Sequence, residues 1–125
     1  ENARRWIGNI MFAGKEVRVF LKGQAKESFL ELKKRNDKEA QSILNSIERI
    51  KVILQTNPQY GNPISRELIP NVFLKQGIKN LYRVELSNFW RMLYTLEGNK
   101  VEIFLFVLSI IDHPTYNKLF GYKKS

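Results

Sequence analysis

The sequence contains no cysteine and only one histidine. The absence of cysteine excludes a disulfide framework and any metal site built from thiolates. A single histidine leaves zinc or iron without a convincing ligand set, so we expect chemistry that needs no metal and no other cofactor. We also find no glycine-rich phosphate loop, no nucleophile elbow and no pair of carboxylates at a useful spacing. These absences argue against the enzyme classes that depend on such motifs.

Long hydrophobic runs are also missing. The most apolar stretch, residues 101–111, is interrupted by Glu102 and Ser109, and it is too short and too rich in β-branched residues to span a bilayer. Residues 1–14 contain arginine and lack the continuous apolar segment of a signal peptide. We therefore expect a soluble, cytoplasmic protein that makes no contact with membranes.

Positive charge is what the chain has in excess. Twenty-one lysine and arginine residues against twelve aspartate and glutamate residues give a formal net charge of +9 at pH 7. An excess of this size indicates a polyanionic partner such as RNA, DNA or an acidic protein. Charge alone does not choose among these three partners.

The length of 125 residues, of which 43% are hydrophobic, suits one domain with a buried core. We assign this domain to residues 16–125 and expect residues 1–15 to form a flexible N-terminal extension. Charged and apolar residues alternate over residues 16–21, which is typical of a short strand.

Two helices are expected next. Apolar residues at helical spacing predict a helix from Gln24 to about Arg35, and Asp37 can cap a second, longer helix. The apolar stripe of this second helix comprises Ala40, Ile43, Leu44, Ile47, Ile50 and Leu54. Since only two residues separate the helices, they are predicted to form a helical hairpin.

Turn-forming residues over 57–63 end the hairpin, and a mixed stretch over 65–80 follows, with one short helical turn or strand near residues 67–74. The rest of the chain predicts an antiparallel meander. Its strands are expected at residues 82–86, 89–96 and 101–111.

The last two of these strands are joined by a tight turn at Gly98-Asn99. Because residues 101–111 are apolar on both faces, they predict a central strand. Asp112 and Pro114 then favour a short C-terminal helix. The expected fold is thus α+β, with a short N-terminal strand and a helical hairpin packed on an antiparallel sheet.

Arg91 is the first candidate for a functional residue. Side chains alternate across a sheet, so Arg91 shares a face with apolar Leu93. A buried guanidinium group needs either a carboxylate, such as Glu85 or Glu102, or an anionic ligand. The sequence leaves both explanations open.

His113 and Tyr116 follow the last strand, one strand away from Arg91. A titratable group beside a permanent cation can serve phosphate chemistry, and a helix N-terminus also attracts phosphate. Helix capping alone would also explain the residues around His113. Lys75, Lys79 and Arg83 would form a phosphate clamp or, alternatively, a solvated basic face.

Three motifs occur in order in the second half of the chain. They read Leu81-Tyr82-Arg83-Val84, then Trp90-Arg91-Met92-Leu93-Tyr94, then Leu108-Ser109-Ile110-Ile111-Asp112-His113-Pro114-Thr115-Tyr116. In their spacing, and in the order of the expected elements from about Val17 to Tyr122, the chain resembles the RelE/ParE toxin superfamily of bacterial and archaeal toxin–antitoxin modules.

The resemblance implies a type II toxin that is held inactive by a cognate antitoxin and cleaves mRNA without a metal, on the ribosome or free. In that chemistry the ribose 2′-OH attacks the adjacent phosphate. Arg91 would stabilise the charge that builds on the phosphate, and His113 or Tyr116 would transfer a proton or orient the nucleotide. The residues that would hold the RNA backbone are Lys75, Lys79 and Arg83.

The chain also departs from the family pattern. Some members carry a carboxylate base after a Gly-x-Pro turn, whereas here Gly61-Asn62-Pro63 is followed by Ile64. Glu67 is therefore a displaced candidate for the base. The superfamily also contains gyrase-directed toxins, so the fold leaves open both that target and a non-catalytic RNA- or protein-binding module.

Overall fold

The computed structural model describes residues 11–12 and 14–121, with the side chains of residues 14–121. Most of the expected N-terminal extension therefore lies outside the described residues. The elements, in chain order, are β1 (Met11–Phe12), β2 (Lys15–Leu21), α2 (Gly23–Lys34), α3 (Lys38–Thr56), β3 (Asn62–Pro63), the 3-10 turn η1 (Arg66–Leu68), α4 (Asn71–Leu74), β4 (Tyr82–Glu85), the 3-10 turn η2 (Ser87–Phe89), β5 (Arg91–Gly98), β6 (Glu102–Ile111) and α5 (His113–Leu119).

The strands form one sheet in the order β1-β2-β6-β5-β4-β3. Strands β4, β5 and β6 make the predicted antiparallel meander, and β6 occupies the predicted central position. The expectation of a wholly antiparallel sheet is wrong, because β2 pairs with β6 in the parallel direction. The helical hairpin after β2 is long enough for a parallel crossover, and a side-chain pattern carries no information about strand direction.

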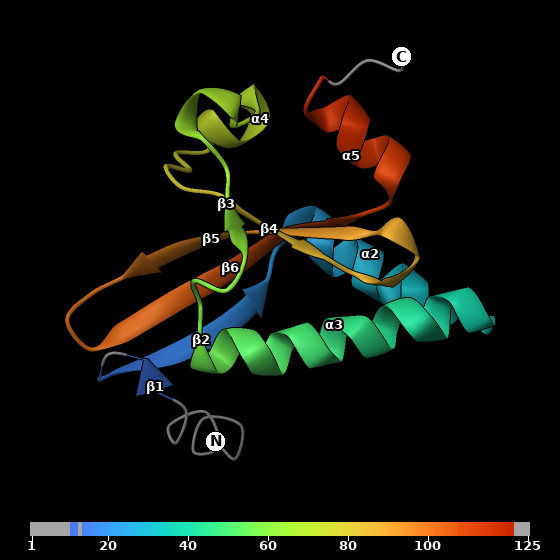
Figure 1. Cartoon of the computed structure of the whole chain (residues 1–125), viewed down its shortest axis with the longest axis horizontal. Helices are drawn as coiled ribbons and strands as arrows, with labels where there is room; N and C mark the ends of the chain where they lie inside the picture. The colour runs from blue at the N-terminus through green and yellow to red at the C-terminus, as the bar shows by residue number, and fades with distance from the viewer. Residues whose placement is uncertain (1–10, 13, 122–125) are drawn as a thin grey trace.

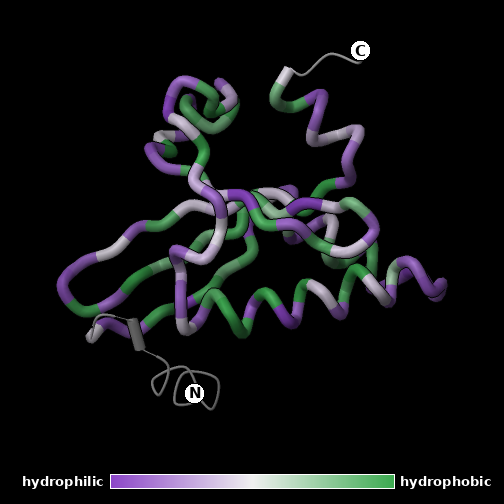
Figure 2. The backbone as a smooth tube through the Cα atoms, viewed as in Figure 1, coloured by the Kyte–Doolittle hydropathy of each residue, from purple (hydrophilic) through white to green (hydrophobic). Residues whose placement is uncertain are grey.

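Helices α2 and α3 cover one face of the sheet, whereas α4 and α5 lie on the other (Figure 1). The Asp37 carboxylate caps α3 as predicted, since it accepts a hydrogen bond from the Ala40 N–H at 2.9 Å. Hydrophobic and hydrophilic residues alternate along α3 (Figure 2). Its predicted stripe packs on the sheet through the buried residues Ala40, Ile43, Ile47, Ile50 and Leu54. Among the described residues, no helix is both long enough and apolar enough to cross a membrane.

A second, smaller cluster lies between the sheet and α4 and α5, and it includes Leu93, Ile111 and Tyr116. Leu93 belongs to this cluster, whereas its neighbours Met92 and Tyr94 belong to the core under the hairpin. The alternation predicted for this strand is therefore confirmed. The register shifts between Leu93 and Tyr94, which accommodates one extra residue in β6 without changing the face of either side chain.

The predicted start of α5 is confirmed, whereas the predicted start of β5 is wrong. The Asp112 carboxylate caps α5 by accepting from the Thr115 N–H at 3.0 Å, which confirms the predicted helix start. The second strand of the meander begins at Arg91 and not at Phe89. Asn88 and Phe89 have φ angles of 58° and 63°, a left-handed conformation that an extended strand excludes.

Tyr94 ties the sheet to the loop that follows α3. Its ring is completely buried and stacks on Tyr82 at 5.1 Å between centroids. Its hydroxyl donates to the Pro58 carbonyl at 2.7 Å and accepts from the Gly61 N–H at 2.9 Å. Burial raises the pKa of Tyr94 to about 12. The neutral phenol is thus part of the folded structure.

Tyr94→Phe is expected to lower the free energy of unfolding by about 1–3 kcal/mol, because two buried backbone groups lose their partner.

The raised pKa of Tyr94 also makes the stability of the wild type depend on pH. Between pH 10 and 12 the unfolded chain loses the phenol proton while the folded chain keeps it, so stability falls as pH rises, by roughly 2–3 kcal/mol. Denaturant unfolding at pH 8 and pH 11.5 measures both effects. Tyr60→Phe, at a 49% exposed position, is the control. An alkaline loss of equal size in Tyr94→Phe and the wild type would contradict this account.

Candidate functional site

Two arginines and a glutamate lie on the sheet face under α5. Glu85 of β4 pairs with Arg91 of β5, and Arg83 pairs with Leu93. Since residues two apart on a strand share a face, Arg83, Glu85 and Arg91 point the same way. Tyr116 of α5 packs over them, with its ring centroid 5.1 Å from Arg91 Cζ and 5.8 Å from Arg83 Cζ. We call Arg83, Glu85, Arg91 and Tyr116 the two-arginine site.

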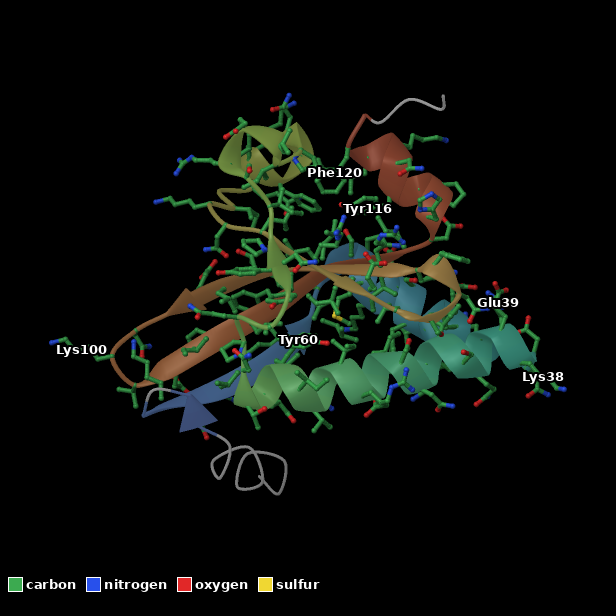
Figure 3. All side chains as sticks on the ribbon, in the orientation of Figure 1. Lys38, Glu39, Tyr60, Lys100, Tyr116 and Phe120 are labelled. Atoms are coloured by element: carbon green, nitrogen blue, oxygen red, sulfur yellow. The ribbon has the colours of Figure 1, made fainter. Side chains whose placement is uncertain are left out.

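Helix α5 places Tyr116 in the space between α5 and the α4 segment, together with Phe120 (Figure 3). Arg83 Nη1 donates to the Tyr116 hydroxyl at 3.2 Å. The tyrosine is 3% exposed, so its ring and hydroxyl hold the guanidinium groups of both strands in place. Cations above an aromatic face are attracted by the ring quadrupole, most strongly where water is excluded.

Glu85 contacts both guanidinium groups. Its Oε1 lies 3.4 Å from Arg91 Nε and its Oε2 lies 3.5 Å from Arg83 Nε, so both are long ion pairs. Of the two partners predicted for Arg91, Glu85 is therefore the one observed, and Glu102 pairs with Arg18 at 3.1 Å. Glu85 is 54% exposed, whereas the Arg91 side chain is only 12% exposed. The carboxylate can thus move away into water and the guanidinium cannot.

Arg91 remains incompletely satisfied. Its Nη1 donates to the Phe89 carbonyl at 2.8 Å. Its Nε–H is buried and has no hydrogen-bond acceptor among the residues that the structure describes. A buried donor without an acceptor is destabilising, and an anionic ligand would satisfy it. The two explanations offered for Arg91, a carboxylate partner and an anionic ligand, are therefore compatible.

A small hollow of 180 Å³ adjoins the site. Its lining is Asn62, Pro63, Ile64, Ser65, Leu68, Arg83, Tyr116 and Phe120. A larger hollow of 480 Å³ lies on the same sheet face. Neither arginine of the two-arginine site lines it. Most of its exposed lining is apolar, with residues such as Phe106 and Leu108. Because an anion needs charged partners, the two-arginine site suits an anionic ligand better than the larger hollow does.

His113 is exposed at the first residue of α5, and its Nε2 lies 3.2 Å from Asn117 Nδ2. Arg91 lies opposite Ile111, two residues before His113, so the two backbones are near each other. No described contact joins the imidazole ring to Arg91. The role of His113 in proton transfer stays a prediction.

The other predicted residues lie in the segment between β3 and β4. Lys79 lines a hollow with Leu96 and Glu97, at the opposite end of β5 from Arg91. Lys75, at the end of α4, and Glu67, in η1, are exposed. Their roles also stay predictions.

Glu85 is the residue of the site that sequence reasoning undervalued. The sequence alone indicates it only as one of two possible partners for Arg91. The signal that identifies it is the β4–β5 register, which places Glu85 directly opposite Arg91. The length of the turn between the strands sets this register, and the irregular turn Ser87–Phe89 is not evident from the sequence.

The helical hairpin on one face of the sheet, the antiparallel meander and the C-terminal helix are expected from the resemblance to RelE/ParE toxins, whereas the parallel pairing of β2 is not. A solved structure described as a YoeB/ParE toxin from Agrobacterium tumefaciens aligns with 77% of this chain and 98% of its own, with a TM-score of 0.55 and 10% sequence identity. The predicted resemblance is thus confirmed for the fold. No protein-family model matches the chain, and no curated protein matches it in sequence.

Proposed function

We propose that this protein is the toxin of a type II toxin–antitoxin module and that it cleaves mRNA without a metal. The observation that carries the proposal is the convergence of Arg83 and Arg91 on Tyr116, with a buried Arg91 N–H that needs an acceptor. The fold likeness to a YoeB/ParE toxin and the net charge of +9 support it.

The proposed reaction starts with attack of a ribose 2′-OH on the adjacent phosphorus, and the bond to the 5′ oxygen breaks. Arg91 and Arg83 stabilise the charge that develops on the phosphate oxygens, since preorganised donors act most strongly in a partly dehydrated site. Tyr116 orients the two guanidinium groups. In this proposal Arg83 contacts the reacting phosphate and does not hold the flanking RNA backbone as expected from the sequence. That backbone is bound by Lys75 and Lys79.

Proton transfer is assigned to Glu85 and His113. The half-exposed carboxylate of Glu85, displaced from the arginines by the phosphate, accepts the proton of the 2′-OH. It thereby takes the role that the sequence suggested for Glu67. His113, exposed at the start of α5, supplies a proton to the leaving 5′ oxygen.

The end chemistry of the products tests the proposal. Incubation with translating ribosomes, and separately with free mRNA, is expected to produce new 2′,3′-cyclic phosphate and 5′-OH ends, because the nucleophile belongs to the RNA itself. Sequencing methods selective for each end type detect them, and the double variant Arg83→Ala/Arg91→Ala is the control.

The competing functions give different results in the same preparations. A gyrase-directed toxin would leave RNA intact and produce gyrase-linked breaks in supercoiled DNA. A non-catalytic binding module would produce neither product. New RNA ends that carry a 3′-OH would contradict the proposed mechanism.

We also propose that a cognate antitoxin silences the protein by placing an acidic segment over the two-arginine site. The basic character of the chain favours such a partner, since complementary charge steers association and fixes orientation. An acidic side chain there would reach the same Arg91 donor as the phosphate.

A further inference from the structure

We propose that Phe89 forms a stacking site for an unpaired RNA base beside the two-arginine site. The inference rests on the proposed function and extends it, because it assigns a residue to the recognition of the nucleotide next to the reacting phosphate. It starts from the turn between β4 and β5, residues Ser87–Phe89.

The backbone of this turn is strained. Asn88 and Phe89 have consecutive positive φ angles of 58° and 63°. Asparagine adopts this region with some ease, but phenylalanine rarely does, so the conformation at Phe89 is unfavourable on its own. The rest of the structure must therefore hold the turn in this conformation.

Several hydrogen bonds do so. The Leu86 N–H donates to the Trp90 carbonyl at 2.8 Å, which closes the base of the turn, and the Trp90 N–H donates to the Ser87 carbonyl at 3.2 Å. Two serines of α3 also hold the turn. The Ser87 N–H donates to Ser46 Oγ at 3.2 Å, and the Ser42 hydroxyl donates to Ser87 Oγ at 2.9 Å. The turn is thus fixed to helix α3.

The effect of this anchoring is to expose an aromatic ring. Phe89 is 78% exposed, more than any other large apolar side chain of the described residues. The Phe89 carbonyl accepts from Arg91 Nη1 at 2.8 Å. This hydrogen bond links the backbone of Phe89 to the Arg91 guanidinium group, which we propose contacts the phosphate.

The surroundings of the ring favour an RNA base over a protein partner. Ser87 and Asn88, which precede Phe89 in the chain, are polar and at least partly exposed, and so is Glu85 at the end of β4. Protein interfaces concentrate their binding energy in well-packed clusters of buried side chains. Base stacking needs only one exposed aromatic face beside a cation that holds the backbone.

Binding of a fluorescein-labelled single-stranded oligoribonucleotide, followed by anisotropy, tests the inference. A 2′-O-methyl group at each position removes the 2′-OH nucleophile and so prevents cleavage. Phe89→Ala is expected to raise the Kd about 5- to 150-fold, the loss of one stacked base, and Phe89→Trp to restore binding. Val101→Ala, at a 70% exposed position in the turn between β5 and β6, is expected to bind like the wild type.

An abasic version of the same oligonucleotide separates stacking from other effects. On it, Phe89→Ala and the wild type are expected to bind equally, because no base is present to stack. Unchanged affinity of folded Phe89→Ala for the normal oligonucleotide would overturn the stacking site and leave the proposed function intact. An equal loss on both oligonucleotides would also overturn it. Absence of wild-type binding to the oligonucleotide would overturn this inference, whereas the proposed function is tested separately by the RNA ends formed on translating ribosomes.

Discussion

Replacing Arg91 by alanine is expected to reduce mRNA cleavage about 100- to 1000-fold and to relieve growth arrest. The loss of one preorganised donor from a partly dehydrated site typically has an effect of this size. The fold should survive, since Glu85 is half exposed and keeps its contact with Arg83. Cleavage of ribosome-bound mRNA by the purified variant, with circular dichroism to verify folding, measures the outcome.

Two matched variants sharpen this experiment. Arg91→Lys should restore activity only in part, because an ammonium group cannot reproduce the planar, two-pronged contact with phosphate. Arg49→Ala removes an exposed arginine from α3 and should cleave like the wild type. A folded Arg91→Ala that cuts at the wild-type rate would refute the catalytic assignment. An unfolded variant would indicate that Arg91 serves mainly as a structural ion-pair partner.

Leu105→Ala is expected to have the largest effect on stability. Leu105 is completely buried on the central strand β6, opposite Val19 of β2 and Leu96 of β5. Truncation of a buried leucine is destabilising by about 2–5 kcal/mol, a large part of the roughly 5–15 kcal/mol that stabilises a domain. We expect the Tm to fall by roughly 10 °C.

Leu30→Ala provides the comparison for this variant. Leu30 is 50% exposed on α2, so the same chemical change should alter the free energy of unfolding by no more than about 0.5 kcal/mol. Thermal and urea unfolding of both variants measure the difference. Equal melting temperatures for the two variants would contradict the placement of Leu105 in the core.

The sequence predicted those features that depend on local periodicity. The alternation around Arg91 was sufficient to assign its face, because strand side chains repeat every two residues. The stripe of α3 and the Asp37 and Asp112 caps were also evident from short-range patterns. Of the predicted site residues, Arg83, Arg91 and Tyr116 come together because they lie on neighbouring strands and the helix that packs on them.

The features that were missed depend on chain direction and on the path of irregular segments. The parallel pairing of β2 has no local signature. The path of residues 65–80 decides where Lys75 and Lys79 lie, and turn-rich sequence does not specify such a path. Phe89 was assigned to a strand because its hydrophobicity suits one, whereas its backbone is left-handed.

The parallel pairing of β2 with β6 has a consequence for biosynthesis. Strand β2 cannot pair with β6 along its full length until Val107 has been made. Gln24 exchanges hydrogen bonds with the backbone of Ile110, 86 residues further along. Contacts of such separation form late, and Tyr116 follows them in the chain. A nascent chain that has not yet been extended to Tyr116 therefore has neither a complete sheet nor the two-arginine site.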